Sequence, residues 1–180
     1  MKKGKSIFKR WWFWLIVIII VGGAINASNK PKKVESTGTA QEQNKDSKKE
    51  DSIQTYKVGD TIEVKDFKVK VNKVSISNGG EVIKPQKGNE FVKVDVTVEN
   101  ISKEEQTVSS VLMFKVVDKD GRSCNQAITE NQKGQLDGNV APGRKITGEY
   151  VVEAPKGAKD LELQFDSSLL SSGQVIVKLN

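Results

Sequence analysis

Apolar and polar side chains alternate along most of the chain beyond residue 55, which is the pattern of strands with one buried face. The clearest stretch, EFVKVDVTVEN at 90–100, places four valines on one face and charged or polar residues on the other. The same alternation recurs at 62–64, 67–71, 146–152, 161–165 and 175–179. Gly, Pro, Asn and Asp separate these stretches, so the pattern predicts about seven to nine short strands.

Two details of the pattern predict local geometry. The alternation slips by one residue at Lys65-Asp66, which predicts a bulge or a short turn. The stretch 108–117 predicts a strand with Leu112, Phe114 and Val116 on its inner face, followed by a turn at 118–121. No helical period is found beyond residue 27.

These strands predict an all-β domain over residues 55–180, built as an antiparallel immunoglobulin-like β-sandwich. A closed barrel is the alternative. The cysteine–tryptophan–cysteine core of immunoglobulin domains is absent, because the chain has one cysteine and its three tryptophans all precede residue 15. The expected likeness to that fold is therefore one of architecture.

The N-terminal region has a different pattern, an apolar run from Trp11 to Ile25 that follows five basic residues. This arrangement predicts one transmembrane helix over 11–27, with segment 1–10 in the cytoplasm and the rest of the chain outside the cell. The residues expected at the membrane interface are Lys9, Arg10, Trp11, Trp12 and Trp14.

A cleaved signal peptide is the alternative for this segment. The apolar run of fifteen residues suits cleavage, with small-residue sites after Ala24 and Ala27, whereas the cluster of tryptophans suits a retained anchor. No cysteine follows the run, so we expect no lipid-modified cysteine. In both cases the domain is expected outside the cytoplasm, either tethered or secreted.

Composition and charge change with position along the chain. Segment 28–54 holds few large apolar side chains and is expected to be a disordered linker. The net charge of +6 arises mainly from segment 1–10, because residues 54–180 hold 18 basic and 18 acidic residues. A nucleic-acid partner requires a basic patch on the domain itself, so none is expected.

The supply of reactive side chains is small. The chain has no histidine and one cysteine, Cys124, which argues against histidine-activated nucleophiles and rules out an intrachain disulfide. We therefore expect no catalysis, no metal and no cofactor. The alternative is a hydrolase acting on a wall polymer through paired Asp and Glu carboxylates, which need no histidine.

Two positions near the turn at 118–121 have chemical alternatives. Asp118 and Asp120 before Gly121 form part of a calcium-loop pattern, but a third oxygen ligand is missing and Asp-Lys-Asp-Gly is also an ordinary hairpin turn. Cys124 is expected to be buried or inert. Intermolecular pairing and, last, a catalytic thiolate are its alternatives.

Several polar features are candidates for recognition. A group of lysines is expected to protect an edge strand, or alternatively to contact anionic wall polymer or phospholipid headgroups. The group consists of Lys65, Lys68, Lys70 and Lys73. Glycosylation sequons begin at Asn26 and Asn100. The polar loops Glu81–Glu90 and Thr129–Asn139 are where a binding surface is expected, because loops on a rigid sandwich commonly carry function.

The stretches FVKVDVTVENISKEEQTVS and NVAPGRKITGEYVVEAPKGAKDLELQF resemble a bacterial domain of unknown function, frequent in exported, membrane-anchored proteins and lipoproteins of Gram-positive bacteria. The resemblance covers Tyr56–Asn180; its marks are Val98-Glu99-Asn100, Pro142-Gly143, and Pro155 before a Leu-x-Leu-x-Phe strand. It implies an immunoglobulin-like sandwich similar to secreted mycobacterial immunogenic antigens, without catalytic residues. Some members are labelled telomeric repeat-binding factors, a role that the balanced charge of residues 54–180 argues against.

Together these features predict a membrane-tethered, extracytoplasmic binding module of the bacterial cell envelope. Its expected partners are the membrane, through the N-terminal helix, and an envelope protein or anionic wall polymer, bound through loops or by strand addition. The alternatives are a secreted, antigen-like sandwich, the carboxylate-dependent hydrolase, and a structural or sensory spacer with no ligand of its own. Several of the six aromatic residues beyond residue 55 fall on core faces, which weakens a carbohydrate-binding role.

Overall fold

The computed structural model describes residues 32–34, 54–167 and 174–180. The predicted transmembrane segment 11–27 and the five predicted interface residues lie outside these ranges. In the described part of the chain, no helix has the length and apolar character needed to cross a membrane.

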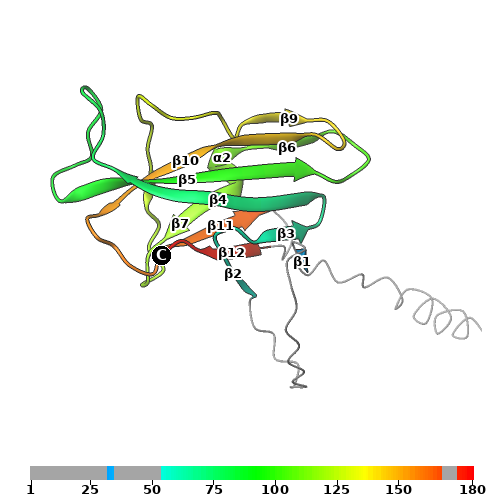
Figure 1. Ribbon diagram of the computed structural model, residues 1–180, viewed down its shortest axis with the longest axis horizontal. Helices are drawn as coiled ribbons and strands as arrows, with labels where there is room; N and C mark the ends of the chain where they lie inside the picture. The colour runs from blue at the N-terminus through cyan, green and yellow to red at the C-terminus, as the bar shows by residue number, and fades with distance from the viewer. Residues whose placement is uncertain (1–31, 35–53, 168–173) are drawn as a thin grey trace, which may run out of the picture.

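Two β-sheets face each other and enclose the core, which confirms an all-β sandwich (Figure 1). The larger sheet contains, in spatial order, β1 (Lys32–Val34), β3 (Thr61–Val64), β4 (Phe67–Ser77), β5 (Asn89–Asn100), β10 (Lys145–Pro155) and β8 (Asn125–Gln126). The smaller sheet contains β2 (Thr55–Lys57), β12 (Gln174–Lys178), β11 (Glu162–Asp166) and β7 (Phe114–Val117). The remaining elements are the paired strands β6 (Gln106–Val108) and β9 (Gly138–Val140) and the short helix α2 (Ser110–Met113).

Strand pairing among the described residues is antiparallel with one exception, the parallel pair of β2 and β12. The slip in the pattern at Lys65-Asp66 is a short turn that joins β3 to β4, and Lys65 has a φ of 51° there. The register of β4 on β5 also shifts between Val71 and Lys73. The short turn lies where the pattern predicted an irregularity, and the register shift in β4 is a second irregularity that the pattern did not predict.

The core fills the space between the two sheets. The four valines of β5, at 92, 94, 96 and 98, are fully buried, as the alternation predicted. Phe165 of β11 meets Phe67 of the larger sheet at a ring-centroid distance of 6.0 Å and Phe114 of β7 at 5.1 Å, both edge to face. The contact of Phe67 with Phe165 joins the two sheets, whereas Phe114 and Phe165 lie on neighbouring strands of the smaller sheet. The apolar area buried between the sheets is the main favourable contribution to folding.

The prediction that Leu112 lies on the inner face of a strand is wrong. Residues 110–113 form α2, and Leu112 is 57% exposed. The backbone N–H of Ser110 donates to one carboxylate oxygen of Asp137 and its hydroxyl donates to the other, at 2.7 and 2.8 Å. This long-range contact with Asp137 holds a helical turn where the local pattern alone indicates a strand.

The segment predicted to be a disordered linker contains a strand at 32–34. This strand, β1, pairs with β3 in the register Lys32↔Glu63, Lys33↔Ile62 and Val34↔Thr61. The rest of that segment up to residue 53 lies outside the described residues. The larger sheet therefore includes a strand contributed from ahead of the domain.

Candidate functional site

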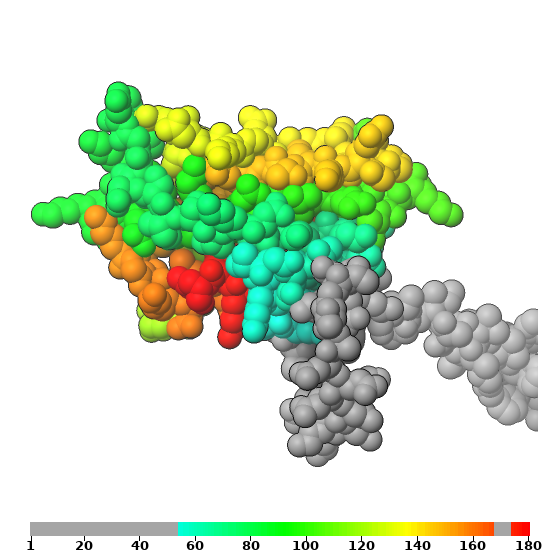
Figure 2. Space-filling view, viewed as in Figure 1, coloured from blue at the N-terminus to red at the C-terminus, as the bar shows by residue number. Residues whose placement is uncertain are grey.

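Two loops meet at one end of the larger sheet. The first loop, residues 78–88, connects β4 to β5, and the second loop, residues 127–137, connects β8 to β9. Figure 2 shows them against each other at the upper left, the first in cyan-green and the second in yellow. We call them the loop pair; they correspond closely to the two loops in which the sequence predicted a binding surface.

Glu130 of the second loop joins it to the first. Its carboxylate accepts hydrogen bonds from the backbone N–H groups of Glu81, Val82 and Ile83, at 3.2, 2.6 and 2.5 Å. A side chain at Gly80 would collide with this carboxylate and displace it from these hydrogen bonds. The hydrogen bonds from Ile83 and Val82, which stabilise the ionised form, lower the pKa of Glu130.

A buried ion pair holds the second loop on the sheet. Lys93 of β5 and Glu149 of β10 lie 2.7 Å apart and are nearly buried. Lys93 also donates to the carbonyl of Asn131 at 3.1 Å, and Glu149 accepts from the backbone N–H of Lys133 at 3.0 Å. Burial raises the pKa of Glu149, but the hydrogen bonds from Lys93 and Lys133 and their charges together lower it.

The first loop is fixed to the sheet in a similar way. Glu153 of β10 accepts from the backbone N–H of Gln86 at 2.9 Å and from the side chain of Asn89 at 2.8 Å. Phe91 and Val151 belong to the sheet face opposite the core valines, yet both are buried. Because Lys93, the register partner of Val151, reaches Asn131, the second loop covers this part of the sheet.

The loop pair presents apolar side chains to solvent. Val82 is 85% exposed, Ile128 is 73% exposed and Ile83 is 37% exposed. Single exposed apolar residues are ordinary on proteins, but a group of them on loops that are held rigidly is typical of an interaction surface. The arrangement therefore suits contact with an apolar surface of another molecule.

Aromatic side chains do not contribute to this surface. All six aromatic residues between Tyr56 and Phe165 are buried, namely Tyr56, Phe67, Phe91, Phe114, Tyr150 and Phe165. Sugar-binding sites commonly stack rings on exposed aromatic faces, so a carbohydrate-binding role is weakened further.

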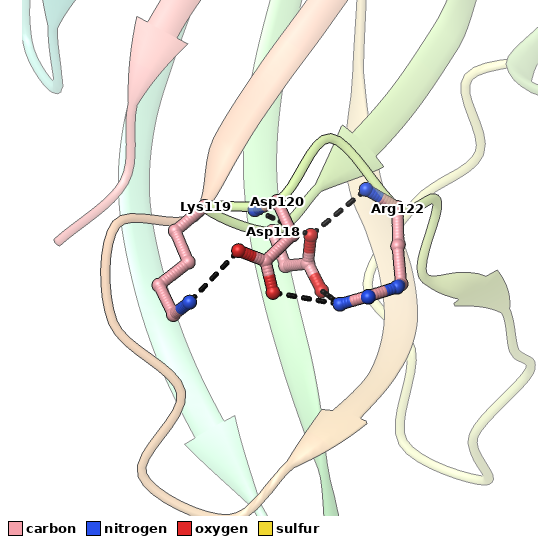
Figure 3. Close-up of polar contacts among 4 residues, drawn as sticks. All are labelled: Asp118, Lys119, Asp120 and Arg122. Atoms are coloured by element: carbon pink, nitrogen blue, oxygen red, sulfur yellow. Dashed lines mark hydrogen bonds and ion pairs between the residues drawn. The ribbon is translucent and has the colours of Figure 1, made fainter.

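The Asp118–Gly121 segment is a hairpin turn, as predicted (Figure 3). One carboxylate oxygen of Asp118 accepts from the backbone N–H groups of Asp120 and Arg122, at 2.9 and 2.8 Å. Asp120 pairs with Lys119 at 2.8 Å and with Arg122 at 2.6 Å, and these hydrogen bonds lower its pKa. Both carboxylates thus have protein partners that a calcium ion would need to replace.

Cys124 is half-buried and packs against the core cluster. Burial raises the pKa of its thiol, and the nearby charge of Asp118 raises it further. A raised pKa keeps the thiol protonated at neutral pH and lowers its reactivity. This agrees with the expectation of an inert cysteine.

The group of lysines does not mark an edge strand at Lys68 and Lys70, so that prediction is wrong there. Both residues belong to the part of β4 that lies between β3 and β5. Lys68 is 3.4 Å from Glu63 on the neighbouring strand, and Lys65 is 4.0 Å from Asp66. The exposed face of this sheet thus mixes both signs of charge.

Asn100 has a structural role that the sequence pattern did not predict. Its side chain is 0% exposed. Its amide donates to the carbonyls of Glu104 and Val140, both at 2.7 Å, and its oxygen accepts from the backbone and hydroxyl of Ser102 at 2.9 and 2.7 Å. A buried and fully paired amide is not a glycosylation acceptor, so the sequon at this position is incidental.

The contact of Glu130 with the first loop predicts a pH dependence. The pKa of this carboxyl lies below its ordinary value of 4.5, so the ionised form favours the joined loops. The stabilisation is complete above that value and is lost as pH falls through the lowered pKa. We expect the hydrogen-exchange protection factors of the 81–83 amides to fall with decreasing pH. In Glu130→Gln they should be low at every pH; equal protection in both proteins would contradict the role of the charge.

Comparison with known proteins places this geometry among domains without an assigned activity. A family model described as a domain of unknown function (DUF4352) matches residues 56–176. An uncharacterised Bacillus subtilis protein, YxkC, is 28% identical, with 73% of this chain and 78% of that protein covered. The crystal structure of yjhA from Bacillus subtilis superposes with a TM-score of 0.54 at 23% identity, over 69% of this chain and 99% of that chain.

A second solved structure places the same fold in a longer chain. The protein ycdA of Bacillus subtilis, whose description proposes a lipoprotein, superposes with a TM-score of 0.55 at 22% identity. The match covers 63% of this chain and 36% of that chain, so this chain spans about a third of ycdA. At these identities the two structures show a shared fold.

Proposed function

This chain belongs to the DUF4352 family of domains of unknown function, and from that premise we propose that it is a membrane-tethered, extracytoplasmic binding module of the cell envelope. The loop pair is its binding surface, and an envelope protein is its partner. The apolar segment 11–27 is its anchor, and the domain carries out no catalysis. The observation that carries the proposal is the group of exposed apolar side chains on loops that Glu130 joins.

The position of the loop pair supports this reading. β1 pairs with β3, which in turn pairs with residues 67–70 at the start of β4, whereas the first loop follows the other end of β4 at Ser77. Figure 1 shows β1 toward the right of the molecule and the loops at the upper left. A domain held from its N-terminal side thus presents the loop pair away from its point of attachment. The proposed lipoprotein ycdA supports an envelope location.

The carboxylates of the loop pair favour binding over the alternative, a hydrolase. A hydrolase of this kind needs a carboxylic acid with a raised pKa to protonate the leaving group. Glu130 and Glu149 both have lowered pKa values and are occupied by backbone N–H groups or by Lys93. Their arrangement suits a structural role, in which they hold the two loops.

In-cell crosslinking followed by mass spectrometry tests the proposal in the full chain. We expect one dominant envelope protein among the crosslinked species and an N-terminal peptide that still contains the tryptophan run. The double variant Val82→Asp with Ile128→Asp should lower the crosslinked yield by at least about tenfold, because charges replace the two most exposed apolar side chains of the loop pair.

The matched control is Ile101→Asp. Ile101 is 39% exposed and directly follows the last residue of β5, where its backbone N–H donates to the carbonyl of Asp66. The first loop adjoins the opposite end of β5, so the substitution leaves the loop pair unchanged. Equal loss of yield in the control and in the double variant would contradict the loop pair as the binding surface. A chain that begins near Ser28 and crosslinks to nothing would instead indicate a secreted domain.

A further inference from the structure

The outer edge of β3 already holds an extended strand. β1 pairs with it over three consecutive residues in antiparallel register, from Lys32↔Glu63 to Val34↔Thr61. An edge strand offers a row of unpaired N–H and C=O groups, and an added strand satisfies them without any particular side chains. The β3 edge is therefore a strand-binding surface, and its occupant is a segment of this same chain.

This occupant lies outside the domain proper. The family match begins at residue 56, whereas β1 ends at Val34, and twenty residues separate it from the start of β2 at Thr55. Lys32 is also only five residues from Ala27, the last residue of the apolar segment. β1 thus belongs by sequence to segment 28–54, which we call the tether, and by hydrogen bonding to the larger sheet.

We propose that Lys32–Val34 is a docking strand that sets how far the sandwich stands from the membrane. The proposal rests on the proposed function, because it takes segment 11–27 as the anchor. With β1 docked on β3, the five residues after Ala27 allow the sheet edge at most about 17 Å from the end of the anchor. With β1 released, the 28 residues up to Thr55 allow about 95 Å.

The length of β1 suits reversible docking. Three residue pairs supply few hydrogen bonds, and each net contribution is small against the entropy of ordering the backbone. The docked and released states are therefore close in free energy, and a modest load on the domain shifts the balance between them. The tether has a short and a long form, and the sheet edge selects between them.

A disulfide trap tests docking in the full chain. The pair Lys32→Cys with Glu63→Cys, in a Cys124→Ser background, joins directly opposed residues of an antiparallel pair, whose Cα spacing suits a disulfide. We expect this disulfide to form at least about tenfold faster than the control pair Gln43→Cys with Glu63→Cys, which lies outside β1. Equal rates for the two pairs would overturn docking.

Fluorescence resonance energy transfer then tests whether β1 docking controls the distance between the sandwich and the membrane, which we call the reach. The full chain, with a fluorescent protein at its C-terminus, is placed in liposomes that carry an acceptor lipid. Lys33→Pro with Val34→Pro removes two consecutive N–H groups, one of which faces β3, so transfer should fall as the sandwich moves outward. Gln43→Pro with Asn44→Pro is the control and should leave transfer unchanged.

The two readouts separate this inference from the proposed function. Unchanged transfer in the β1 proline variant would overturn the control of reach, even where the disulfide trap shows docking. A chain that fails to float with the liposomes would overturn the anchor and, with it, the control of reach. The disulfide rates would still decide whether β1 docks on β3.

Discussion

Val96→Asp is expected to unfold the domain. Val96 lies in the middle of β5, pairs with Val71 and Gly148 on the two neighbouring strands, and is fully buried. An unpaired carboxylate in this position costs about 5 kcal/mol or more. Domains are commonly stable by about 5–15 kcal/mol, so this cost is comparable to the whole stability of the domain. Circular dichroism of the full chain should show loss of strand signal and of the cooperative thermal transition.

The matched control is Thr97→Asp, which places the same charge one residue further along on the opposite face of β5. Thr97 accepts a hydrogen bond from Asn72 at 2.9 Å and lies 2.9 Å from the hydroxyl of Thr147, and an aspartate can accept from both donors. Its cost should be at most about 1 kcal/mol. A melting temperature that is unchanged in Val96→Asp would show that the assignment of the inner face is wrong.

Asn100→Ala is expected to lower the free energy of unfolding by about 3–4 kcal/mol, which is large for a single polar side chain. The substitution removes the amide donor to the buried carbonyl of Val140 and the acceptor of two hydrogen bonds from Ser102. The same side chain ties the end of β5 to the following turn and to β9. Urea denaturation of the full chain measures the change, and the midpoint should fall without a change of slope.

Asn72→Ala is the control for this prediction. Asn72 also makes two side-chain hydrogen bonds, to Asp95 at 2.7 Å and to Thr97 at 2.9 Å, but it is exposed. Water replaces those partners, so the cost should be about 0.5 kcal/mol. Similar losses in the two variants would show that burial does not set the importance of Asn100.

The sequence predicts the parts of the fold that follow from local alternation. The inner face of β5 and the turn at 118–121 each depend on neighbouring residues, and the structure confirms them. The burial of Phe91 and Val151 on the outer face could not be predicted, because it results from a loop that returns from far along the chain. The inward placement of Leu112 fails for the same reason, since Asp137 fixes the helical turn.

The candidate site also has features that the sequence predicts and features that it does not. The composition of the two loops indicates surface segments, and loops are where binding is expected. The contact that joins them links Glu130 to residues 47 to 49 positions earlier, and a single sequence gives no signal for such a contact. The sequence did hold a signal for Asn100, because Val98-Glu99-Asn100 is part of the family resemblance. A buried, hydrogen-bonded amide would explain why asparagine belongs to that pattern.

The parallel pairing of β2 with β12 bears on how this domain can be combined with others. β2 is the first strand of the family match and β12 is the last strand of the chain, and they are neighbours in the register Thr55↔Ile176 to Lys178↔Lys57. Because the two strands are parallel, the polypeptide enters β2 at its Thr55 end and leaves β12 at the opposite end of the pair, beyond Lys178. A unit whose chain enters at one end of a strand pair and leaves at the other can be joined in line with neighbouring domains while its own core stays intact. The match to about a third of ycdA shows the same fold within such a longer chain.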